Sequence, residues 1–228
     1  MEYRKLHPWN LSPGKALEVQ NSLRDRIRIE PLDTRKVRLI AGADISYNRY
    51  SDIAHAAFVV LDIKTLKTVA TGVATGRLSF PYIPGLLTFR EGEPLLEAWK
   101  NLSVAPDVIV FDGQGIAHPR GLGIAAHMGL IIDRPSIGCG KSLLCGKYED
   151  LGPEAGSSAP LIYKGMEIGA AYRTKTDVQP VYISPGYKID LKSSIELISR
   201  CVTKYRIPEP TRQAHILANE LRRGEAAA

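Results

Sequence analysis

The sequence has few cysteines and no long hydrophobic run. It contains three cysteines, Cys139, Cys145 and Cys201, and none lies in a CxxC pair or near a histidine at zinc-finger spacing. We therefore expect neither a disulfide framework nor a structural zinc site, but free thiols in a reducing compartment. No segment approaches the roughly 20 apolar residues of a membrane span, and the polar N-terminus does not resemble a signal peptide. We expect a cytoplasmic protein without membrane association.

The composition has no bias toward disorder or low complexity. Apolar residues make up 44% of the 228 residues and charged residues 24%, which is typical of a globular protein. The length suits one domain, and the single linker-like stretch, 151–159, is too short to separate two. We predict one domain over residues 1–228. The net charge of +6 favours an anionic partner such as nucleic acid, although mildly basic proteins without such a partner are common.

The pattern of apolar residues predicts a mixed α/β fold. The first three strands follow one another through short connections, which indicates an antiparallel meander. Helical periodicity, caps and prolines place the helices between and after the later strands. We expect strands over 37–45, 54–63, 66–75, 107–111, 136–141, 161–173 and 181–183, and helices over 12–29, 93–102, 125–132, 191–204 and 211–223.

Two aspartates, Asp44 and Asp112, end apolar runs. A carboxylate at the end of a buried strand is costly unless it is hydrogen-bonded or holds a cation. If the two strands are neighbours, both acids reach the same edge of the sheet, where a divalent ion would remove their repulsion. Carboxylate oxygens suit Mg²⁺ or Mn²⁺, and such an ion supports phosphodiester hydrolysis. The alternative is that each aspartate caps the following loop or helix.

Long and unusual motifs run through most of the chain. They include AGADISY at 41–47, FPYIPGLLTFREG at 80–92, FDGQGIAHPRGLGIAAHMGL at 111–130 and RIPEPTRQAHILA at 206–218. On these motifs the chain resembles the endonuclease V family, nucleases that cut strands containing deaminated adenine (inosine). The resemblance implies an RNase H-like fold, a mixed central sheet flanked by helices, with acids gathered around divalent metal.

The resemblance also implies the catalytic residues. Asp44, Glu91 and Asp112 correspond to the acidic cluster that binds Mg²⁺, for which Mn²⁺ should substitute. Glu91 would bind a second ion or position the attacking water. Lys141 would reach a phosphate oxygen or help the water lose its proton, unless it is an ordinary surface lysine. His215 would be a second-metal ligand or a proton donor to the leaving oxygen, whereas a lone histidine on a helix is more often structural.

The segment Pro81-Tyr82-Ile83-Pro84 is suited to opening a duplex. An enzyme that acts on a damaged base usually takes it out of the stack. Two prolines stiffen the loop, so holding it in one shape costs little entropy on binding, and Tyr82 and Ile83 can fill the gap left by the base. The resemblance assigns this segment a wedge role led by Tyr82. Alternatively, Tyr82 and Ile83 are core residues of a strand.

The glycine-rich loop 112–123 is the candidate wall of a base pocket. Glycines such as Gly113 and Gly121 let the backbone approach a base, and backbone N–H groups could bind O6 of hypoxanthine while rejecting the amine of adenine. His118 would contact the substrate strand or orient a neighbouring group. His127 lies on an apolar helix face and is expected in the core or close behind the site.

The implied activity is a metal-dependent DNA repair endonuclease. It would hydrolyse the second phosphodiester bond 3′ to deoxyinosine, leaving the base in place and a nick. The alternative is a ribonuclease acting on inosine in RNA. The clustered acids argue against a non-catalytic nucleic-acid-binding module. The wedge segment argues against a metabolic phosphatase. We expect a monomer, with positive charge around the acidic centre on Lys141, Arg90 and Arg120.

Overall fold

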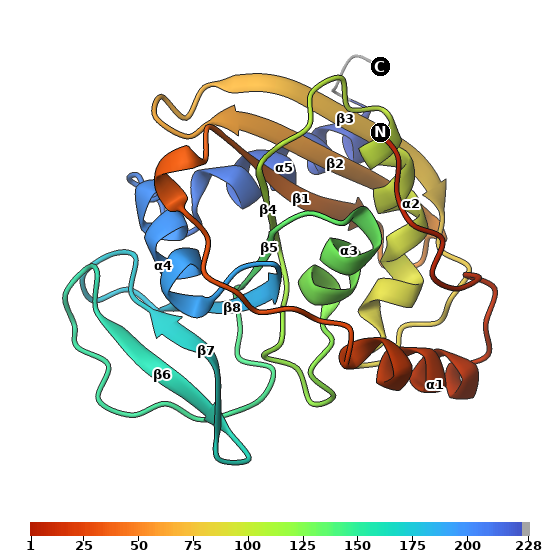
Figure 1. The fold of residues 1–228 in the computed structure, drawn as a ribbon. Helices are drawn as coiled ribbons and strands as arrows, with labels where there is room; N and C mark the ends of the chain where they lie inside the picture. The colour runs from red at the N-terminus through yellow and green to blue at the C-terminus, as the bar shows by residue number, and fades with distance from the viewer. Residues whose placement is uncertain (225–228) are drawn as a thin grey trace.

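A computed structural model describes residues 1–224 and shows one eight-stranded sheet with helices on both sides (Figure 1). The strand order is β3-β2-β1-β4-β5-β8-β7-β6. The strands are β1 (Leu39–Tyr47), β2 (Ile53–Asp62), β3 (Thr68–Arg77), β4 (Val108–Phe111), β5 (Ser136–Gly140), β6 (Ser158–Tyr163), β7 (Met166–Tyr172) and β8 (Val181–Tyr187).

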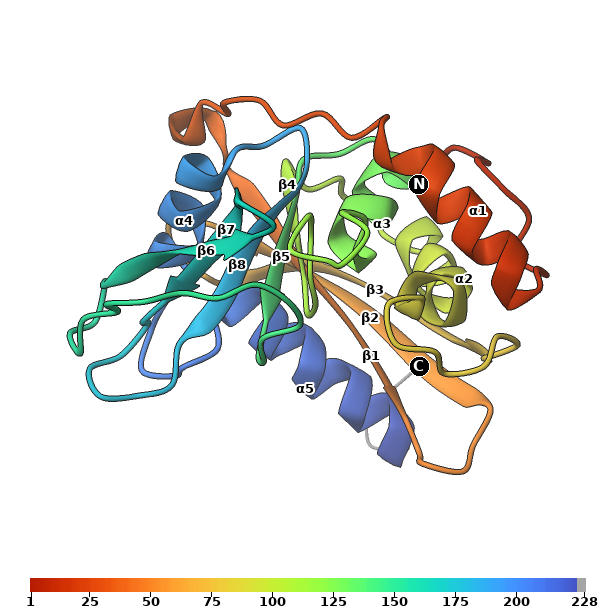
Figure 2. The ribbon, with the colours of Figure 1, turned by 90° about the horizontal axis from the view of Figure 1, so that it is seen from below.

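The helices form two layers around this sheet. They are α1 (Pro13–Arg24), α2 (Leu87–Lys100), α3 (Ile124–Ile132), α4 (Leu191–Arg200) and α5 (Glu209–Arg223), with a short 3₁₀ helix at Thr34–Lys36. Figure 2 shows α5 on one side of β1, and α2 and α3 on the other. Within the described residues, no helix is both long and apolar enough to cross a membrane.

Alternation along the central strands separates two hydrophobic cores. Strands β1 and β4 are parallel neighbours, and successive side chains of a strand point to opposite faces. Ile40 and Val110 pack in the core that includes residues of α4 and α5, whereas Ala43 and Phe111 pack in the core that includes α2 and α3. Whether a residue has an even or an odd number along β1 and β4 therefore decides which face of the sheet its side chain reaches.

The predicted mixed sheet and the antiparallel meander are confirmed, because β1 pairs with β2 and β2 with β3 in antiparallel register. The sheet and its flanking helices place the chain in the RNase H-like class.

Several predicted bounds differ from the structure. Helix α1 ends at Arg24 and not at 29, and α4 ends at Arg200 and not at 204. Helix α2 begins at Leu87, before the predicted 93, and contains the buried Pro94. The single strand predicted over 161–173 is the hairpin β6–β7, which turns where Lys164 and Gly165 have φ of 52° and 79°. Strand β8 continues past the predicted 183, through Pro185, to Tyr187.

Candidate active site

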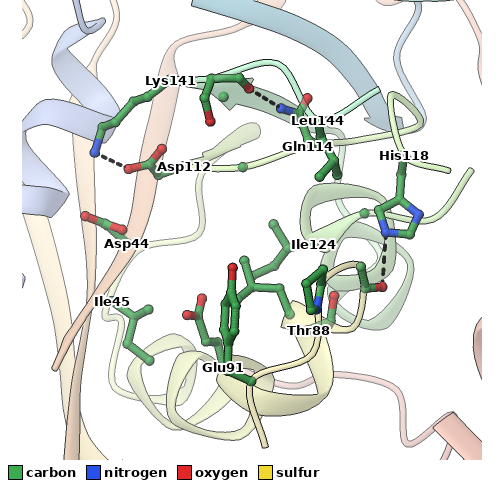
Figure 3. Close-up of a pocket in the computed structure, with 18 of the residues that line it drawn as sticks. Asp44, Ile45, Thr88, Glu91, Asp112, Gln114, His118, Ile124, Lys141 and Leu144 are labelled. Carbon is green, nitrogen blue, oxygen red and sulfur yellow. Dashed lines mark hydrogen bonds and ion pairs between the residues drawn. The ribbon is translucent and has the colours of Figure 1, made fainter. Parts of the chain in front are cut away.

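Two carboxylates meet where β1 and β4 run side by side. Ala43 pairs with Phe111 in parallel register, so Asp44 and Asp112 occupy the next positions, and Figure 3 shows their carboxylates next to each other. The Asp112 N–H donates to the carbonyl of Ala43 at 3.2 Å. The two strands are therefore neighbours, as the metal-site prediction requires. Asp44 is not the end of its strand, since β1 continues to Tyr47.

Helix α5 brings His215 to Asp44. A Cβ atom on Gly42 would lie 1.9 Å from the carbonyl oxygen of Pro210, so only glycine allows the start of α5 to lie this close to β1. His215 Nδ1 is 2.7 Å from Asp44 Oδ2, and the Asn219 amide nitrogen is 3.1 Å from His215 Nε2. Because the amide nitrogen can only donate, Nε2 accepts and Nδ1–H donates to Asp44.

Lys141 and Glu91 complete the charged groups of the site. Lys141 follows β5, and its Nζ forms an ion pair with Asp112 (Figure 3). Glu91 lies in α2 with 6% of its surface exposed and accepts a hydrogen bond from the Tyr47 hydroxyl at 3.3 Å. Burial and the nearby Asp44 raise the pKa of Glu91 to about 8. Burial and Asp44 also raise the pKa of Asp112, against the opposing effect of Lys141.

The donor set fits a divalent cation. Asp44, Asp112 and His215 each offer one ligand atom, and these atoms lie within 4.8 Å of one another. Carboxylate oxygens are the ligands that Mg²⁺ and Mn²⁺ prefer. A cation at this position would relieve the repulsion between the partly buried carboxylates. Glu91 lies outside this group of three, on the α2 side, although its charge interacts with both aspartates.

A cavity of about 540 Å³ joins the acids to most of the predicted nucleic-acid-binding residues. Pro81 and Gly121 are not among the described residues that line it, and Gly121 instead forms a turn whose N–H donates to the His118 carbonyl at 2.8 Å. The lining contains Asp44, Glu91, Asp112, Lys141, Tyr82, Ile83, Pro84, Gly113 and His118.

The wedge segment 81–84 is an anchored loop with one projecting aromatic ring. Tyr82 is 67% exposed, so it is not a core residue of a strand. Ile83 is half-buried and packs against the cluster that contains Phe80 and Phe89. Ile83 therefore holds the loop down, while Tyr82 remains available to a ligand.

The two histidines of the motif 111–130 are both buried and differ in their contacts. The His118 Nε2–H donates to the Gly85 carbonyl at 3.0 Å (Figure 3), and its Nδ1 accepts the Arg120 N–H at 3.1 Å. Burial, with Arg120 close by, lowers the pKa of His118 to about 4. His127 is fully buried and bonds to His7 at 2.9 Å, in agreement with a core position, and burial lowers its pKa to about 3.

The arginines expected around the cleft bind the protein itself. The Arg90 guanidinium donates to the Phe80 carbonyl at 2.6 Å, and Arg120 donates to the Gly85 carbonyl at 2.8 Å. Both arginines therefore hold the two ends of the wedge segment. Sequence reasoning also missed Gln20, which lies buried on α1 with Ala16 and Leu23; it is a polar residue three and four positions from apolar ones, and that spacing was the available signal.

Comparisons with known proteins give one consistent family. Residues 21–216 match the family model for Endonuclease V. Endonuclease V of Myxococcus xanthus is 51% identical over 96% of this chain and 94% of that protein. The crystal structure of endonuclease V from Streptomyces avermitilis aligns with a TM-score of 0.90 and 41% identity over 96% of each chain. Ciona intestinalis endonuclease V, solved with a 24mer DNA containing an inosine followed by a ribo-adenosine, aligns with a TM-score of 0.80 and 27% identity over 93% of this chain and 98% of that one.

Proposed function

The chain belongs to the endonuclease V family of nucleases, and we propose that it is a metal-dependent repair endonuclease specific for inosine in DNA. It hydrolyses the second phosphodiester bond on the 3′ side of the lesion and leaves a nick with the base in place. The DNA bound by the Ciona intestinalis relative supports this choice of substrate. We propose that the protein acts as a monomer.

The observation that carries the proposal is the shared cavity. Its volume of about 540 Å³ lies within the range of roughly 300–1,000 Å³ that is usual for small-molecule sites, which leaves room for an extruded nucleotide. The exposed Tyr82 lines this cavity together with Asp44, Glu91 and Asp112. A base taken out of the stack therefore enters a space that also contains the candidate cleavage site.

Base recognition falls to the loop after β4. Gly113 lines the cavity beside Asp112 and has φ of 155°, a conformation that favours glycine. Without a Cβ atom, its backbone can lie against the flat face or edge of a purine. A backbone N–H group there would donate to O6 of hypoxanthine, whereas the amine of adenine, itself a donor, would find no acceptor.

Asp44 and Asp112 would hold a Mg²⁺ ion, near Glu91 and His215. When bound, the ion would supply orientation of water and stabilisation of negative charge on the phosphate. In the hydrolysis, a water oxygen adds to phosphorus, the water loses a proton, one P–O bond breaks, and the leaving oxygen gains a proton. Lys141 Nζ sits beside Asp112 and contributes positive charge toward the phosphate. His215 lies beside Asp44, and in its imidazolium form it would donate a proton to the leaving oxygen.

The test uses a labelled duplex with a single inosine and its undamaged twin. We expect cutting of the inosine strand at the second bond 3′ of the lesion in Mg²⁺, and none in a chelator. Asp112→Asn should bind the inosine duplex and not cut it, because the side chain keeps its shape and loses its charge. Absence of inosine-dependent cutting in Mg²⁺ overturns the proposal. Ser22→Ala, an exposed change on α1, is the control and should cut like the wild type.

A second candidate is cleavage of inosine-containing RNA at the same site. It draws support from the ribo-adenosine that follows inosine in the DNA of the Ciona intestinalis complex, since a 2′-hydroxyl is tolerated there. Three substrates separate the candidates: an inosine DNA strand, the same strand with one ribonucleotide after the inosine, and the full RNA strand. A DNA repair enzyme cuts the first at least as fast as the third.

A further inference from the structure

Helix α1 reaches the wedge through one buried glutamine. Gln20 is 1% exposed and lies on the same face of α1 as Ala16 and Leu23, which are also buried. Its amide nitrogen donates to two carbonyls on different segments, Gly85 at 2.9 Å and Leu122 at 2.8 Å. Its amide oxygen accepts a hydrogen bond from Arg120 Nε. The donor and the acceptor of this side chain are thus both satisfied, as a buried polar group requires, and all three bonds lead to the two segments that contribute Gly85 and Leu122 to the cavity lining.

The Gly85 carbonyl is the point where these contacts converge. It accepts hydrogen bonds from Gln20, from His118 at 3.0 Å and from Arg120 at 2.8 Å. Gly85 directly follows the wedge segment and has φ of 80°, and a Cβ atom there would lie 2.5 Å from Arg120 Nη2. The residue after the wedge is therefore fixed in position and direction by three side chains from two other parts of the chain.

The second carbonyl, that of Leu122, belongs to the glycine-rich loop 112–123, which lines the cavity as well. Leu122 lines the cavity together with Gly113 and Ile124, and so do Tyr82 in the wedge segment and Gly85 directly after it. One amide group thus ties the wedge to the loop proposed to read the base. The distance between the two is set by a side chain that lies outside the cavity lining.

We propose that Gln20 is a specificity-positioning residue, which holds the wedge and the base-reading loop at the separation that an extruded inosine requires. This inference rests on the proposed function. Gln20 acts through Gly85 and Leu122 and does not touch the nucleic acid. A wedge already held in its working position loses less conformational entropy on binding the lesion, whereas binding of undamaged duplex does not need the wedge to enter.

Two substitutions separate hydrogen bonding from space filling. Gln20→Leu removes the donor and the acceptor. Gln20→Glu keeps the size and the acceptor for Arg120, but places an oxygen against the Gly85 and Leu122 carbonyls. A residue that merely fills space would tolerate Gln20→Leu, so loss of specificity in that variant points to the lost hydrogen bonds, and the same loss in Gln20→Glu points to the two donated ones. Should Gln20→Leu fail to fold, Gln20→Glu carries the test alone.

Binding is measured by fluorescence anisotropy in an Asp112→Asn background, with an inosine duplex and its undamaged twin. We expect both Gln20 variants to lower the ratio of the two affinities about tenfold, or about 1.4 kcal/mol, with affinity for undamaged duplex within about twofold. In a Tyr82→Ala background the Gln20 substitutions should add nothing, because both act through the wedge. Leu197→Ala, a truncation of a fully buried side chain in α4, controls for lost stability and should leave the ratio unchanged.

The outcomes distinguish this inference from the proposed function. If the unsubstituted protein does not prefer the inosine duplex, the proposed function fails. If it does, and the Gln20 variants keep that preference within twofold, the inference is wrong. Equal loss on both duplexes, full additivity with Tyr82→Ala, or the same loss in Leu197→Ala would also overturn it.

Discussion

Replacement of Gly42 by alanine should disable the site without touching any of its charged groups. The added Cβ would lie 1.9 Å from the Pro210 carbonyl oxygen and 2.1 Å from its carbon. Ordinary contact begins at 3.4 Å, so the start of α5 must move from β1 by about 1.5 Å. His215 follows Pro210 on the same helix and is 2.7 Å from Asp44, a distance that such a shift stretches beyond hydrogen-bond length.

The expected effect is large on catalysis and moderate on stability. A displacement of about 1 Å in a catalytic group can cost about 100-fold in rate, and overpacking typically costs about 1–3 kcal/mol. Single-turnover cleavage of the inosine duplex should therefore slow about 100-fold, with binding retained because the wedge is untouched. Gly76→Ala in β3 is the matched control, since its Cβ would be 3.4 Å from the nearest atom, on Pro94. Cleavage by Gly42→Ala within threefold of wild type, in folded protein, would refute the reasoning.

Three further predictions concern the cavity. Tyr82→Ala should weaken binding of the inosine duplex more than binding of undamaged duplex, and equal loss in a binding titration would argue against a wedge. Lys141→Met should slow single-turnover cleavage by about 10- to 100-fold while leaving duplex binding nearly unchanged, because it removes one positive charge beside Asp112; a change confined to binding would place Lys141 on the phosphate backbone instead. The pKa of His118 is about 4 in the folded protein, whereas the same imidazole in the unfolded chain binds a proton near pH 6.5. Below pH 6.5 protonation therefore favours the unfolded chain. The contribution of neutral His118 to stability is present above pH 6.5 and is lost as the pH falls toward 4. The difference in unfolding free energy between wild type and His118→Gln, followed by denaturant titration, should shrink by up to about 3 kcal/mol across that window, and a constant difference would contradict the assignment.

Much of the site follows from alternation along the strands. Asp44 lies four residues after Ile40, and Asp112 two residues after Val110. Because side chains alternate between the faces of a sheet, both carboxylates lie on the face that α5 covers. Apolar runs that end in acids were enough to predict that these two carboxylates would meet if the strands were neighbours. The sequence alone did not fix that neighbourhood, because the pairing of β1 with β4 joins segments separated by two strands and a helix.

Contacts that depend on the close approach of two backbone segments could not be predicted from the sequence. Nothing in the pattern around Gly42 shows that α5 will lie against it, and the prolines near 80–94 hid the early start of α2, which places Glu91 on a helix. The sequence predicts Arg90 and Arg120 around the acidic centre, but charge alone does not reveal which groups they bind. In the structure, Arg90 and Arg120 donate to carbonyls at either end of the wedge.

The most direct test of the account is the position of a Mn²⁺ ion located by anomalous diffraction from crystals of the protein. The account predicts a peak at coordination distance from the carboxylates of Asp44 and Asp112, with His215 and Glu91 beside it, and loss of that peak in Asp112→Asn. A peak elsewhere, or none in protein that still cuts the inosine duplex in Mn²⁺, would contradict the assignment of these carboxylates as the metal centre.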